Sequence, residues 1–228
     1  MADLLTAGTE ALWEAAFRTG DYAEADALLR GALDQVNGDR ATEAAVLNLL
    51  GWLMHFQALD RGCDPTFADD EEALFRRALA IRRDIGDLGG VAGSLFGVGL
   101  VHQVLHDDFA TAMPYFWEAL ELADEHADEL TRSEVHRHVG FYHVFAAEQL
   151  DEGVRHLRIS LDLRHSHGDD RWTPSGTLAL GEAELARGNR TEAMKLLNEA
   201  VREARAARLS PRGIARAEDT LRAAESCT

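Results

Sequence analysis

Three histidines and one glutamate each follow a glycine by three or four residues, within otherwise apolar segments. The pairs are Gly51 with His55, Gly99 with His102, Gly140 with His143, and Gly181 with Glu184. Imidazole and carboxylate groups on neighbouring segments could bind a metal ion or move protons. The pattern therefore makes His55, His102 and His143 candidate metal ligands. Acid–base chemistry would use His102, His143 and Glu184 instead.

Further side chains accompany this set and suggest a binding groove. His106 lies four residues beyond His102, so on a helix the two share a face. Trp52 and Phe141 each follow one of the glycines directly, and Arg137 precedes Phe141 by one helical turn. Aromatic and imidazole rings could hold a small organic molecule or an apolar peptide side chain, and an arginine could clamp a carboxylate.

The elements that must position these residues are helices. Ala, Leu, Glu and Arg dominate the 228 residues, and only four prolines occur. One pattern recurs along the chain and is clearest in LALGEAELARGNRTEAMKLLNEAV. Gly181 lies within a first helix there, Gly188 and Asn189 form a turn, and a second helix follows with Ala193, Leu197 and Ala200 on one face. The pattern predicts a helical hairpin.

Other copies repeat this hairpin around the remaining glycines. The first-helix glycines Gly51, Gly97 or Gly99, Gly140 and Gly181 recur every 41 to 48 residues. Glycine costs about 1 kcal/mol relative to alanine inside a helix, so each is expected to permit a close approach of a neighbouring helix. Ser210 and Pro211 are typical of a helix start and predict one further helix at the end.

The spacing from Gly181 to Gly188, Ala193 and Ala200 resembles that of a tetratricopeptide repeat (TPR), in a long bacterial form. The resemblance implies an all-α, right-handed superhelical solenoid of about five helix pairs plus a C-terminal capping helix. We expect a single domain, 1–228, with pairs at about 2–37, 40–86, 88–126, 128–168 and 171–208 and a cap at 210–226. In this family the histidine position usually holds an aromatic residue packed between paired helices, so a purely structural role for the imidazoles is the alternative.

The net charge and the absence of known catalytic, cofactor-binding and membrane-spanning motifs limit the classes of function to consider. A net charge of -17 disfavours nucleic acid, and no 18-residue apolar stretch or signal peptide is evident. No known enzyme signature occurs, and no cofactor is expected. We therefore expect a cytoplasmic, acidic, non-catalytic scaffold of bacterial type that binds a protein or peptide in its concave groove. The alternative is a small-molecule-binding or biosynthetic protein, catalytic or metal-binding, that uses the His- and aromatic-lined groove. The oligomeric state is open.

Overall fold

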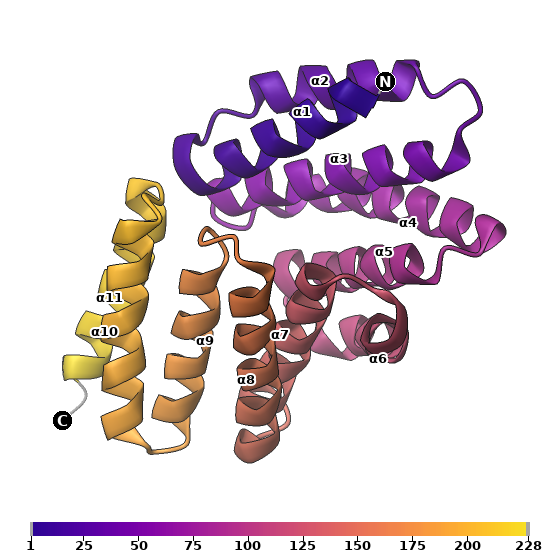
Figure 1. Ribbon diagram of the computed structural model, residues 1–228. Helices are drawn as coiled ribbons and strands as arrows, with labels where there is room; N and C mark the ends of the chain where they lie inside the picture. Colours follow the sequence, from indigo (N-terminus) through magenta and orange to yellow (C-terminus); the bar gives the residue numbers. More distant parts are fainter. Residues whose placement is uncertain (1, 227–228) are drawn as a thin grey trace. The chain divides into compact units, whose positions relative to one another are not determined.

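Helices account for all the regular structure in residues 2–226, the part of the chain that the computed structural model describes (Figure 1). Eleven α-helices occur in that range, together with two short π-helices and one 3₁₀-helix, and it contains no strand. The prediction of an all-helical chain is confirmed. The chain divides into two compact units, Met1–Ala127 and Asp128–Thr228.

The first unit contains three helix pairs. Their bounds are α1 (Ala2–Glu14), which continues as the π-helix Ala15–Thr19, and α2 (Ala23–Asp34); α3 (Arg40–Asp60) and α4 (Ala68–Ile85), with the 3₁₀-helix Pro65–Phe67 before α4; and α5 (Leu88–Leu100), which continues as the π-helix Val101–Leu105, and α6 (Phe109–His126). Within each pair the second helix packs along the first.

The second unit contains two helix pairs and one terminal helix. Their bounds are α7 (Glu129–Phe145) and α8 (Leu150–His167), α9 (Thr173–Ala186) and α10 (Arg190–Ala206), and α11 (Pro211–Ser226). Pro211 occupies the first position of α11, and the Ser210 hydroxyl accepts a hydrogen bond from the Gly213 amide at 3.2 Å. The helix start expected at these two residues is thus present.

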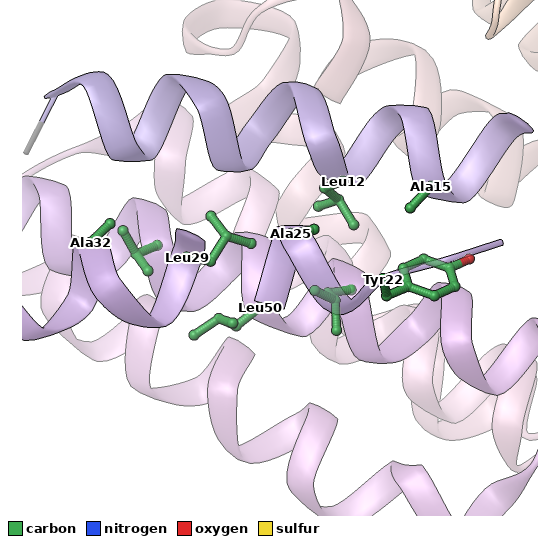
Figure 2. Close-up of a cluster of buried hydrophobic side chains, with 9 residues drawn as sticks. Leu12, Ala15, Tyr22, Ala25, Leu29, Ala32 and Leu50 are labelled. Atoms are coloured by element: carbon green, nitrogen blue, oxygen red, sulfur yellow. The ribbon is translucent and has the colours of Figure 1, made fainter. Parts of the chain in front are cut away.

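Apolar side chains from both helices of a pair form each local core, as the first pair illustrates. Leu12 of α1 meets Ala25 and Leu29 of α2, and Leu50 of α3 closes the cluster (Figure 2). All four side chains are buried. Small residues on one helix and leucines on the next therefore bring the helices together by burying apolar surface.

A glycine in the first helix of every pair accepts a large side chain from the second helix. The contacts join Gly8 with Leu29, Gly51 with Phe75, Gly99 with Phe116, Gly140 with Leu157, and Gly181 with Leu197. A Cβ atom at any of these glycines would lie within 3.0 Å of that side chain. The close approach expected for the first-helix glycines is therefore observed, and the chain is a tandem array of one repeated hairpin.

Phe75 shows how strict this packing is. Its buried ring fits between two glycines, since a Cβ on Gly51 would come within 2.7 Å of it and a Cβ on Gly97 within 2.3 Å. We expect Gly97→Ala to lower the free energy of unfolding of the first unit by about 1–3 kcal/mol, because the ring cannot move away from both helices. Urea unfolding followed by hydrogen exchange in residues 2–127 measures this.

Gly31 in α2 supplies the matched control. Its nearest neighbour to an added Cβ is the Leu4 side chain at 3.9 Å, an ordinary contact. Gly31→Ala is expected to raise the free energy of unfolding by up to about 1 kcal/mol through helix propensity alone. The same sign for both substitutions would contradict the packing argument.

One stretch, Leu88–Leu105, is long and apolar enough to cross a membrane by length and composition alone. It comprises α5 and its π-helical continuation, and 67% of it is buried inside the fold. Most of this stretch therefore belongs to the helical core of the first unit.

Candidate functional site

His102, His143 and Glu184 occupy equivalent backbone positions near the ends of their first helices. Each backbone carbonyl accepts a hydrogen bond from the amide of the residue that precedes the second helix: from Asp108 at 2.9 Å, from Gln149 at 2.8 Å and from Asn189 at 2.9 Å. The three side chains therefore start from the same place in successive hairpins. What each side chain meets there differs from pair to pair.

His55 of α3 lies within its own helix pair. Its Nδ1 is 2.9 Å from Oε1 of Glu71 on α4, and both side chains are buried. The rings of Trp52 and Phe56 meet the imidazole edge-on. Oε2 of Glu71 is buried and has no hydrogen-bond partner in the described structure, so this pair is only partly satisfied. The contact joins α3 to α4.

Trp52 belongs to an aromatic cluster of the first unit. Its ring centroid lies 6.1 Å from that of Trp13 on α1, 5.6 Å from that of Phe56, and 5.9 Å from that of Phe96 on α5. The indole is half-buried. From α3 it therefore packs against rings of α1 and α5.

His102 sits in the π-helix Val101–Leu105, and π-helices often occur at functional sites. Its ring stacks on that of Tyr115 with centroids 5.9 Å apart, and its Nε2 is 3.4 Å from Oε1 of Glu72. That nitrogen is buried and makes no hydrogen bond within the described residues. The His106 ring lies 5.9 Å away, so the predicted association of the two histidines is present. Their role as a ligand site stays a prediction.

Glu184 is fully buried and surrounded by hydrogen-bond donors. Oε1 accepts from Arg158 at 2.6 Å, and Oε2 accepts from Arg187 at 2.8 Å and from the Asn189 amide at 3.1 Å. Both carboxylate oxygens are thereby bound by donors from α8 or from the turn after α9. The carboxylate acts as a polar tie between helices in the second unit.

His143 belongs to a cluster of three imidazoles between α7 and α8. Its ring stacks on His156 with centroids 5.5 Å apart and planes 13° apart, and its Nδ1 is 2.9 Å from Oε1 of Gln149. Nδ1 of His156 in turn lies 2.9 Å from Nδ1 of His136. All three histidines are buried.

Burial and charged neighbours determine the protonation states of His156 and Glu152. Burial, with smaller contributions from His136 and Arg155, lowers the pKa of His156 to about 4, so this ring is neutral at pH 7. Glu152 lies 3.4 Å from His156 Nε2 through its Oε1 atom. The hydrogen bond from Arg155 lowers the pKa of Glu152 to about 2, which keeps the carboxylate ionised. The neutral His156 ring thus faces an ionised carboxylate.

Arg137 lies on α7 beside an aromatic ring. Its guanidinium carbon is 4.8 Å from the centre of the Phe141 ring, and its Nη1 is 3.2 Å from Nε2 of His138. Burial lowers the Arg137 pKa to about 10, and the Glu134 carboxylate, 3.7 Å from Nη1, opposes this shift. The charges of Arg164, of Arg216 on α11 and of Glu182 on α9 have smaller effects. Its Nε is buried without a hydrogen bond to any described residue. Arg137 is thus a cation on an aromatic platform whose donors are not all satisfied.

Several buried polar groups of the second unit were not among the site residues predicted from the sequence. Arg164 of α8 is fully buried and pairs with Glu134 of α7, while its other nitrogens donate to Ser133, to the Trp172 carbonyl and to Ser175. Desolvation lowers the Arg164 pKa, and Glu134 opposes that shift. A signal existed, because Arg164 continues the apolar stripe of Leu157 and Leu161 along α8.

The predicted site residues fall into separate groups. His55, His102 and His106 belong to the first unit, whereas His143, Arg137 and Glu184 belong to the second. Within the units, His102 meets His106 and His143 meets His156. A cavity of about 550 Å³ lies between α2, the turn before it and the end of α3, and one of about 340 Å³ lies between α2, α3 and α4; both are lined by Asp26 and Arg30. None of the predicted groove residues lines either cavity.

Comparison with known proteins bears on the fold. The chain is similar to the crystal structure of BtubC (BKLC) from P. vanneervenii, with a TM-score of 0.58 and 21% identity over 82% of this chain and 74% of that chain. At this identity the likeness supports a shared helical-repeat fold alone. No family model matches the chain, and no curated protein matches it.

Proposed function

We propose that the chain is a tetratricopeptide-like scaffold that catalyses no reaction and binds a protein or peptide through an exposed carboxylate. The binding face would be formed by the first helices of the second unit, α7 and α9, together with α11. The finer architecture, a right-handed superhelix of helix pairs with an inner groove, is part of this proposal.

The observation that carries the proposal is the state of Arg137. Its Nη1 lies 3.7 Å from Oε2 of Glu134, but its buried Nε has no hydrogen-bond partner among the described residues. A buried donor in that state is rare and calls for an explanation. Burial has already removed part of the hydration of this guanidinium, so an added carboxylate would gain more from it than from a solvated arginine. Phe141 beneath it offers an apolar surface to the neighbouring atoms of a bound peptide.

The charges around Arg137 fit a peptide guest. Glu182 and Arg216 stand on the neighbouring elements, and both act on the Arg137 charge. Burial raises the Glu182 pKa, with Arg216 and Arg137 opposing the shift. A guest carboxylate near Arg137 and Arg216 and a guest amide near Glu182 would be complementary to this face.

The histidines nominated for chemistry also favour a binding role. His55 and His143 are held between the helices of their pairs, and Glu184 accepts hydrogen bonds from three donors. These engaged groups are poorly placed to exchange protons with a guest. His102 is the exception, since its Nε2 makes no hydrogen bond within the described residues. The comparison with BtubC (BKLC) adds support for a helical-repeat scaffold and names no guest for this chain.

Selection from a display library of random peptides with free carboxyl termini tests the proposal. We expect an enriched peptide family that shares an Asp, a Glu or the terminal carboxylate. Arg137→Gln should weaken binding of that family by roughly 30-fold or more, the usual cost of removing one member of a desolvated charge pair.

Arg202→Gln is the matched control, because Arg202 lies exposed on α10. It should leave the affinity unchanged. A selection that enriches no peptide, or an enriched family that binds both variants equally well, would overturn the proposed function.

A further inference from the structure

We propose that His143, His156 and Glu152 bind a divalent metal ion of borderline softness, for which Zn²⁺ is the natural probe. Each of the three offers one ligand atom, and these atoms lie within 4.8 Å of one another. Two imidazoles and one carboxylate form a donor set that zinc commonly takes in proteins. The site uses none of the side chains assigned to the peptide face.

The spacing of two of the ligands already suits a metal. His156 Nε2 and Glu152 Oε1 are 3.4 Å apart. Two ligands at zinc distances of about 2.0–2.1 Å in tetrahedral geometry stand about 3.3–3.4 Å apart. This edge of the site is therefore at coordination distance with no change in backbone position.

Hydrogen bonds fix the tautomers that a metal needs. Nη2 of Arg155 lies 3.1 Å from His156 Nε2, and a guanidinium only donates, so Nε2 carries the lone pair. The His156 proton is then on Nδ1, which donates to Nδ1 of His136. His143 Nδ1 faces the Gln149 carbonyl oxygen, so its Nε2 carries the lone pair.

This pattern is the one that surrounds bound metals. A metal-ligating histidine usually donates its other ring N–H to a fixed acceptor, which orients the ring and raises its basicity. His136 and Gln149 stand in that outer position for His156 and His143. A cluster built only for packing does not require both Nε2 atoms to carry the lone pair.

The Arg155 guanidinium already places a positive charge between two of the proposed ligands. Its Nη2 donates to Glu152 Oε1 at 2.5 Å and to His156 Nε2 at 3.1 Å, so a cation already bridges two of the three ligands. Its side chain is 55% exposed and can turn into solvent when an ion arrives. Arg155 therefore competes with the metal.

His143, the third ligand, must rotate its ring before it can bind the ion. A metal lies in the plane of each imidazole that binds it, and the rings of His143 and His156 are stacked with planes only 13° apart. The His143 ring must turn about its Cβ–Cγ bond to direct Nε2 toward the ion. Metal binding is thus expected to break the stack and shift the ring resonances of both histidines.

The test is Zn²⁺ titration of the full chain, purified without a histidine tag and stripped with a chelator. Calorimetry should find one ion per chain, and ring ¹H–¹⁵N spectra should show ligation at Nε2 of His143 and His156. Glu152→Gln, at a partly exposed position that does not threaten folding, should weaken binding roughly tenfold or more. Arg155→Ala should tighten binding, because it removes the competing cation.

His165→Ala and His167→Ala are the controls, since both histidines are exposed at the end of α8. Neither should change the affinity. The proposal is overturned if the wild type takes up no stoichiometric ion, if Glu152→Gln binds as well as the wild type, if Arg155→Ala binds no tighter, or if a control abolishes binding.

Discussion

Arg164→Met is expected to lower the free energy of unfolding of the second unit by about 3–5 kcal/mol, the usual cost of breaking a buried ion pair from one side. The substitution keeps most of the volume but removes the closest partner of the buried Glu134 carboxylate, which keeps Arg137 Nη1 at 3.7 Å and His138 Nε2 at 3.9 Å. It also removes the donors to Ser133, Ser175 and the Trp172 carbonyl. Hydrogen exchange of peptides within residues 128–226 during urea unfolding measures the change directly.

Two further variants isolate the cause. The double variant Glu134→Gln with Arg164→Met removes both charges of this pair and should recover a large part of the loss, because the buried carboxylate is then neutralised together with its main partner. Arg202→Met on the exposed surface of α10 should change stability by no more than about 0.5 kcal/mol. If the single and double variants are equally unstable, the lost packing rather than the buried charge dominates.

The second large effect is a loss of stability at mildly acidic pH through His156. Its folded pKa of about 4 lies below the ordinary value of 6.5. The unfolded state therefore binds more protons than the folded state between these values, and the stability is lost as the pH falls from 6.5 to 4. One group shifted this far contributes on the order of 2–3 kcal/mol, at about 1.4 kcal/mol per pH unit.

Other groups in the second unit also titrate, so the measurement compares variants. Burial raises the pKa values of Glu182 and Glu203, and these carboxyls oppose the histidine as the pH falls. Their contribution is common to the wild type and His156→Gln and cancels in the difference. Between pH 6.5 and 4 the wild type should lose about 2–3 kcal/mol more than His156→Gln, whereas the exposed variant His165→Gln should follow the wild type. Parallel curves for all three proteins would refute the prediction.

The repeated hairpin could be predicted because it is encoded locally. A glycine at one helix position and leucine or phenylalanine at the matching position of the next helix recur in each pair, and the structure joins the two in every case. The equivalence of His102, His143 and Glu184 followed from the same spacing. Helix periodicity carries this information within about twenty residues.

The partners of the buried polar groups could not be predicted, because they depend on how neighbouring helices are rotated. Nothing local in the sequence indicates that His156 would stack on His143 or that Arg164 would reach Glu134. The π-helix that carries His102 was also missed. One extra residue in a turn rotates the side chains beyond it by about 100°, and no residue type marks the insertion.

A charged residue within the apolar stripe of a helix is itself a signal of a buried partner. On α8 the charged residue Arg164 continues a row of buried apolar side chains. A charge on an apolar stripe predicts a buried counter-charge, since an unpaired one is too costly. The identity of that counter-charge still required the fold.

A double-mutant cycle in isothermal titration measures whether Arg137 receives a carboxylate from a peptide partner. The selected peptide is measured with its carboxylate and as the corresponding amide, against the wild type and Arg137→Gln. We expect a coupling free energy of at least about 1.4 kcal/mol, a tenfold effect lost when either group is removed. Additive changes, with the amide bound as tightly as the acid by the wild type, would contradict it.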